Sequence, residues 1–213
     1  MKSALRTLVG LLLIPAPAAF GAAIEVTVVD LKGKPVPEAV VYLHGVPGKF
    51  KAPKAPVVMD QIDKMFVPHV LPVLVGSKVR FPNKDAIHHH VYSFSKQKKF
   101  DLPLYKGEPP EPVLLDAEGV VKLGCNIHDW MLGYIVVLSN PYFAKTGADG
   151  KARIEGVRPG TYKLALWSGR RKEPGESTLQ TVVVDKKKGA EAPFKLKFSH
   201  PYVAYKQDSS KYR

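Results

Sequence analysis

The stretch VVKLGCNIHDWMLGYIVVL, residues 120–138, contains the pattern on which the expected fold rests. Two runs of β-branched and other apolar residues, Val120–Leu123 and Gly133–Leu138, flank a short polar loop. Runs of this length and composition predict two β-strands joined by that loop. The loop contains three side chains with sulfur or nitrogen atoms that can bind a metal ion: Cys125, His128 and Met131.

The rest of the chain repeats this alternation of short strands and turns. The 213 residues include 19 prolines and 17 glycines, which are spread along the sequence and therefore separate many short segments. No stretch shows the apolar spacing of a long amphipathic helix. We therefore expect an all-β protein. Further strands are expected at 24–30, 39–43, 57–60, 70–75, 78–81 and 90–94.

Two outer segments each look like half of a small β-sandwich. Residues 23–45 contain two strand-like runs around a Gly-Lys-Pro turn, and residues 146–166 contain two more around Asp-Gly and Pro-Gly turns. The two segments resemble the first and second halves of carboxypeptidase regulatory-like domains, which implies a structural sandwich without chemistry of its own. Neither half has enough strands to close a sandwich alone. We therefore expect the halves to pair around a domain inserted into a loop, where insertions are tolerated.

The cysteine loop offers the ligand types that favour copper. A thiolate, an imidazole nitrogen and a weak thioether suit a trigonal copper site with a long axial bond. Such a site needs one more nitrogen, and three consecutive histidines at 88–90 can supply it. Side chains alternate in direction along an extended chain, so His89 is expected to face away from His88 and His90.

Several motifs resemble cupredoxins. FPNKD at 81–85, followed by His89 and Val91, resembles the strand that delivers the first histidine ligand, and the spacing of the cysteine loop resembles the amicyanin type. With FVPH at 66–69, residues 57–138 are similar to the cupredoxin-like proteins often labelled methylamine utilisation proteins. The resemblance implies a cupredoxin-like Greek-key β-sandwich, inserted into the smaller outer sandwich. It also implies one copper ion bound by His89, Cys125, His128 and Met131.

The two residues that flank His89 depart from that family pattern. Amicyanin-like proteins have a proline before the first histidine and an asparagine after it, and this chain has His88 and His90 there. Which of His88, His89 and His90 binds the metal ion therefore stays open. Cys125 could also be a buried core thiol, Met131 could be a core side chain, and a cysteine with two or three histidines could bind zinc.

No catalytic constellation stands out, so we do not expect an enzyme. The sequence shows no serine nucleophile motif, no glycine-rich phosphate loop and no suggestively spaced pair of carboxylates. A nucleophilic dyad of Cys125 and His128 is a weaker alternative, because Met131 lies beside it at ligand spacing.

The N-terminus has the layout of a secretory signal. Lys2 and Arg6 precede an apolar run at 8–14, and small residues follow at 16–23. The apolar run is too short to span a bilayer, although an uncleaved anchor is an alternative. We expect export to the periplasm, where a single cysteine, Cys125, calls for an explanation such as metal binding.

The formal net charge of +13 points to a kind of partner. For an exported protein, a basic surface fits an acidic protein partner, such as a cytochrome or dehydrogenase that exchanges electrons, rather than nucleic acid. Membrane association is expected to be peripheral at most. A basic surface that is merely well solvated is the simpler alternative.

These observations predict an order of segments and a function. We expect a signal peptide at 1–22, the outer sandwich at 23–51 and 142–200, the copper domain at 52–141 and a basic tail at 201–213. The expected function is an exported copper protein with a type 1-like site that carries one electron. The alternatives are a module for copper delivery or storage, and a structural or interaction sandwich with a vestigial site.

Overall fold

The computed structural model describes residues 22–109, 111–170 and 178–197, and within these ranges the chain is all-β, as predicted. The predicted signal peptide at 1–22 lies outside the described residues except for Ala22, and the predicted basic tail at 201–213 lies wholly outside them. None of the described segments forms a helix long and apolar enough to cross a bilayer.

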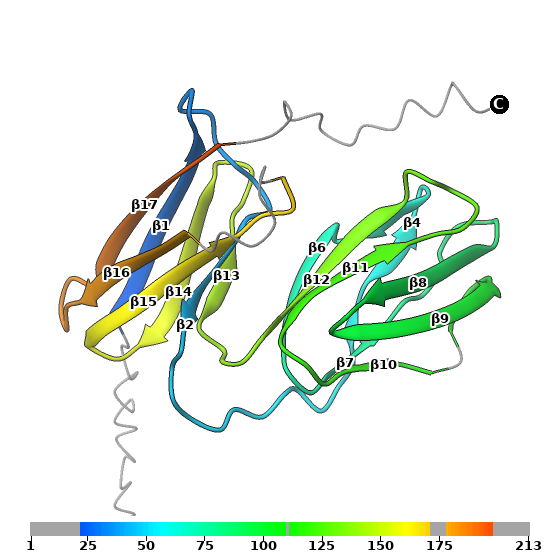
Figure 1. Cartoon of the computed structure of the whole chain (residues 1–213), viewed down its shortest axis with the longest axis horizontal. Helices are drawn as coiled ribbons and strands as arrows, with labels where there is room; N and C mark the ends of the chain where they lie inside the picture. The colour runs from blue at the N-terminus through cyan, green and yellow to red at the C-terminus, as the bar shows by residue number, and fades with distance from the viewer. Residues whose placement is uncertain (1–21, 110, 171–177, 198–213) are drawn as a thin grey trace, which may run out of the picture.

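Strands from both ends of the chain form one pair of packed sheets, the outer sandwich, on the left of Figure 1. The first sheet contains, in spatial order, β14 (Lys151–Val157), β1 (Ala22–Asp30) and β17 (Ala190–Leu196). The second contains β13 (Phe143–Lys145), β2 (Val40–His44), β15 (Gly160–Trp167) and β16 (Thr178–Val184). The two sequence halves thus pair with each other, β1 with β14 and β2 with β15. The exact domain boundaries stay a prediction.

The intervening strands form a second group of sheets, here called the central sandwich, on the right of Figure 1. The largest sheet contains, in spatial order, β6 (Val70–Leu74), β12 (Leu132–Leu138), β11 (Gly119–Gly124), β8 (His89–Ser95) and β9 (Lys98–Tyr105). Another contains β10 (Val113–Leu115), β7 (Ser77–Arg80) and β3 (Val57–Val58). The hairpin of β4 (Asp60–Ile62) and β5 (Met65–Val67) completes this group.

The strand pattern explains where each core lies. In β8, His89, Val91 and Ser93 are buried, whereas Phe94 faces outward, because side chains alternate along a strand. Strand β12 instead buries both faces, which accounts for its continuous apolar run. Its Ile135 packs in the core of the central sandwich, and its neighbour Val136 packs on the opposite face.

That opposite face of β12 joins the two sandwiches. Val136 and Leu138 pack with Val40 of β2 in a small buried cluster, and Trp167 of β15 packs against the same cluster. The Trp167 ring lies 5.3 Å from the Tyr134 ring, centroid to centroid. The two sandwiches therefore share an apolar contact in addition to the connecting chain.

Prolines within strands mark the edges of the sheets. Pro72, Pro103 and Pro193 lie in β6, β9 and β17, each of which is an edge strand. An edge position suits proline because it lacks the N–H that a central strand would need. Strands β9, β16 and β17 were not predicted from the sequence, and two of these contain a proline.

Candidate metal centre

The pairing of two strands brings the histidine run to the cysteine loop. Strand β11 runs antiparallel to β8, with Gly124 opposite Tyr92. Cys125, which follows β11 directly, therefore lies near the start of β8, where His89 faces the core. The residues of the site come from strand β8 and from the loop that follows β11, although 36 positions of sequence separate His89 from Cys125.

Two imidazoles and one thiol meet inside the central sandwich. One ligand atom from each of His89, Cys125 and His128 lies within 4.8 Å of the other two. The Cys125 Sγ atom lies 3.7 Å from His128 Nδ1, and the two histidine rings are 4.9 Å apart between centroids. His89 is fully buried, and Cys125 and His128 are 3% and 9% exposed. Within the described residues, this is the single group of three such side chains that could hold a metal ion.

His89 presents an unused nitrogen to this cluster. Its Nε2 atom lies 2.7 Å from the Asp85 carboxylate, whereas its Nδ1 atom is buried and has no hydrogen-bond partner. An ionised carboxylate only accepts hydrogen bonds, so Nε2 carries the proton and Nδ1 retains a lone pair. A buried polar atom without a partner is costly unless something else satisfies it, and a metal ion would do so.

The Asp85 carboxylate is itself held by backbone donors. It accepts hydrogen bonds from the backbone N–H groups of Asp63, at 2.8 Å, and Lys64, at 2.9 Å. Those two residues form the tight turn between β4 and β5, with φ angles of 53° and 57°. This role of Asp85 could not be predicted, because no sequence pattern links it to a turn more than 20 positions away.

Burial and hydrogen bonding shift the pKa values of the cluster. Burial raises the pKa of the Cys125 thiol, but the adjacent His89 ring and hydrogen bonds from the backbone of His90 and Ile127 outweigh it, so this pKa lies below its usual value. Burial lowers the pKa of His89, but its neighbours Cys125 and Asp85 raise it above the usual value. For His128, burial and the nearby His89 both lower the pKa. The centre thus favours a thiolate beside a neutral His128 imidazole, which are metal-binding forms.

The structure separates the three consecutive histidines. His89 alone joins the cluster, and His88 is exposed to solvent. The His90 ring lies on the other face of β8, where its Nε2 contacts the Asp101 carboxylate. Asp101 is a second histidine partner that no sequence pattern indicated.

Met131 lies at the end of the same loop. It is 1% exposed and belongs to the central core together with Cys125. Its backbone N–H donates to the His128 carbonyl oxygen at 2.9 Å, which closes a turn of the loop. The neighbouring Trp130 is half-buried, and its ring lies 5.3 Å from the His128 ring between centroids. Met131 therefore remains the predicted fourth ligand, on the strength of its loop position.

The donor set fits a soft or borderline metal ion. Metal bonds of about 2.0 Å to nitrogen and about 2.3 Å to sulfur bring the donor atoms to within about 4 Å of one another. The cluster needs only a small contraction to reach this spacing. One thiolate with two imidazoles matches the trigonal set that copper occupies in electron-transfer sites, and zinc also accepts these donors.

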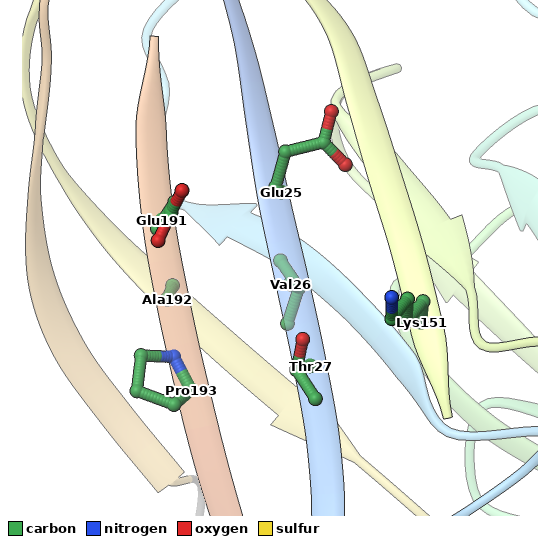
Figure 2. A pocket seen from close by; sticks show the side chains of 7 residues that line it. All are labelled: Glu25, Val26, Thr27, Lys151, Glu191, Ala192 and Pro193. Carbon is green, nitrogen blue, oxygen red and sulfur yellow. The ribbon is translucent and has the colours of Figure 1, made fainter. Parts of the chain in front are cut away.

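A separate hollow lies on the outer sandwich (Figure 2). Its lining comes from three adjacent strands of one sheet: Glu25, Val26, Thr27, Lys151, Glu191, Ala192 and Pro193. Glu25 forms an ion pair with Arg153, so part of the charge on this face is already compensated. The hollow contains no histidine, cysteine or methionine, and we do not place the metal centre there.

Part of the chain is similar to solved cupredoxin structures. A reduced amicyanin mutant shares 23% identity over 41% of this chain and 87% of its own length, with a TM-score of 0.37. A second reduced amicyanin mutant shares 22% over 46% of this chain and 98% of its own, with a TM-score of 0.36. A purple cupredoxin from Nitrosopumilus maritimus shares 23% over 40% of this chain and 100% of its own, with a TM-score of 0.34. No protein-family model and no curated protein match the sequence.

Proposed function

We propose that this chain is an exported copper protein that carries one electron at a time. The observation that supports the proposal is the buried cluster of one sulfur and two imidazole nitrogens, in which His89 Nδ1 has no protein partner. His89, Cys125, His128 and Met131 would hold the ion. A bound copper ion would supply a Cu(II)/Cu(I) couple.

The chain's own residues would keep the site rigid and dry. Cys125 and His128 lie on one short loop between two paired strands, β11 and β12, and His89 lies on the adjacent strand of the same sheet. A frame of paired strands changes little when the charge at its centre changes, which suits electron transfer. His128 is the most exposed of the three, so its ring is the proposed route by which an electron enters or leaves.

Location and partner belong to the same proposal. The layout of the N-terminus supports a periplasmic location. The net charge of +13 supports an acidic redox partner, because opposite charge accelerates and orients encounter. A link to methylamine utilisation rests only on the sequence resemblance.

Metal analysis and optical spectroscopy test the proposal. Protein produced in a bacterial periplasm should bind about one copper per chain and show an intense thiolate-to-copper band in the visible range. A reversible redox titration of that band would support an electron carrier, whereas easy loss of copper to a chelator would favour delivery. Protein that remains colourless and retains only zinc after copper reconstitution would contradict the copper proposal.

A further inference from the structure

Strand β8 carries two histidine–carboxylate pairs that face opposite sides of the sheet. His89 Nε2 pairs with Asp85 on the core side, and His90 Nε2 pairs with Asp101 on the outer side. Only the first pair adjoins the cysteine loop, because His89 and not His90 belongs to the cluster with Cys125. The chain therefore contains both a histidine–carboxylate pair at the centre and a matched pair beside it.

Asp85 is fixed more firmly than an ordinary surface carboxylate. One of its oxygens accepts from the backbone N–H of Asp63, and the other is shared by the N–H of Lys64 and His89 Nε2. The backbone N–H of Asp85 in turn donates to the Asn83 side chain at 3.0 Å. By contrast, the Asp101 side chain is 69% exposed. The structure thus surrounds Asp85 with donors and orients it toward His89.

We propose that Asp85 is the positioning residue of the metal centre, an inference that rests on the proposed copper function. Asp85 holds the proton of His89 on Nε2, so the Nδ1 lone pair faces Cys125 and His128. Its negative charge also makes His89 a stronger electron donor, since a carboxylate behind a ligating histidine raises the basicity of the ring. A stronger donor stabilises Cu(II) more than Cu(I) and lowers the reduction potential.

The first test uses the metal-free protein. Two-bond ¹H–¹⁵N NMR correlations report which nitrogen of each histidine carries the proton. We expect the Nε2–H form for His89 in the wild-type chain, and a mixture of both forms in Asp85→Ala. Asp101→Asn is the matched control and should leave the His89 signals unchanged. An Nδ1–H form of His89 in the folded wild-type protein would overturn the inference without any reference to copper.

The second test uses the copper-loaded protein. Asp85→Asn keeps the size of the side chain and one oxygen that can accept from His89, but removes the charge. We expect its preference for Cu(II) over Cu(I) to fall about tenfold, which for one electron raises the potential by about 59 mV. Asp101→Asn should leave the potential unchanged. Circular dichroism of each variant establishes that it is folded.

The outcomes separate this inference from the proposed function. If the wild-type protein forms the visible band and Asp85→Asn has the wild-type potential, the role of Asp85 is wrong and the copper function stands. Loss of the band in folded Asp85→Ala, but not in Asp101→Asn, would support positioning of His89. If the wild-type protein itself fails to bind copper, the proposed function is wrong, and the potential-lowering role of Asp85 fails with it.

Discussion

Three consecutive histidines have three different environments. His88 is exposed, His89 is fully buried beside Cys125, and His90 packs on the opposite face of the strand beside Asp101. The alternation of side chains along β8 produces this separation of His89 from His90. A single position in the register therefore decides which ring can meet the cysteine loop.

Single substitutions of the histidines test this register. His89→Ala should abolish the visible band of the copper protein, because it removes one of the two nitrogens in the cluster. His88→Ala and His90→Ala should retain the band, with at most a shift for His90, whose backbone contacts the sulfur of Cys125. Optical spectra of the three variants show which histidine the band depends on. A full band in His89→Ala, with loss of the band in one of the other two, would place the ligand at that neighbour.

The predicted role of Met131 as a ligand can be tested by the reduction potential. Met131→Leu should keep copper bound but raise the potential, because a thioether donates more charge to Cu(II) than an alkyl group does. The swap conserves volume, so the free energy of unfolding should change by less than about 1.5 kcal/mol. Met59→Leu, at another fully buried methionine of the same core, is the control for packing alone. Equal potentials in the two variants would show that Met131 is a core side chain only.

At the scale of elements, the turn before β14 depends on a glycine. Gly150 has a φ of +73°, and a Cβ placed there would lie 2.5 Å from the Val28 carbonyl oxygen and 3.0 Å from the Val36 nitrogen. The Val28 oxygen accepts the Val36 N–H, so the added carbon would press on an existing hydrogen bond. This turn thus packs directly against the backbone of β1.

A pair of glycine variants separates conformational strain from steric overlap. Gly156→Ala should cost about 1–2 kcal/mol of unfolding free energy, because its φ of +71° is left-handed but its surroundings are open. Gly150→Ala should cost a further 1–3 kcal/mol, roughly the penalty of overpacking. Chemical denaturation measures both. Equal losses of unfolding free energy in the two variants would mean that β1 moves away from Ala at position 150 without an energetic cost.

At the scale of the whole molecule, the two sandwiches are coupled by a small apolar contact. The contact includes four buried side chains and the rings of Trp167 and Tyr134, and Lys145 adds a hydrogen bond to the Val70 carbonyl oxygen at 2.9 Å. Each sandwich also has its own core. We therefore expect them to unfold together while the contact is intact.

Truncation of the contact should uncouple the sandwiches. Trp167→Ala should lower the free energy of unfolding by about 2 kcal/mol. This is somewhat less than the loss for a fully buried aromatic side chain, because Trp167 is half-buried. Calorimetry should then show two transitions instead of one, and copper should shift only the one that belongs to the central sandwich. Phe94→Ala, at a ring that is 77% exposed, should retain a single transition. Two transitions in the wild-type protein would show that the contact does not couple the sandwiches.

Local patterns of residues are enough to predict the all-β class and the strands that flank the cysteine loop. Alternating and β-branched runs are local signals, and they mark β1, β2, β8, β11 and β12. The grouping of Cys125, His128 and Met131 is also local, because seven residues of chain contain it. Strands β9 and β17 were missed because charged residues and a proline hide their pattern, and only their place at a sheet edge makes the proline tolerable.

The surroundings of His89, by contrast, depend on contacts between segments that are far apart in the chain. The pairing of β8 with β11 places it beside Cys125, and the turn between β4 and β5 supplies the two N–H groups that hold Asp85 behind it. These hydrogen bonds join segments that are 21 and 22 positions apart in the chain. Hydrogen bonds depend on distance and angle in space, and no periodicity of the sequence encodes them. A residue pattern can therefore predict candidate metal ligands, whereas the partners that orient them become known only from the folded chain.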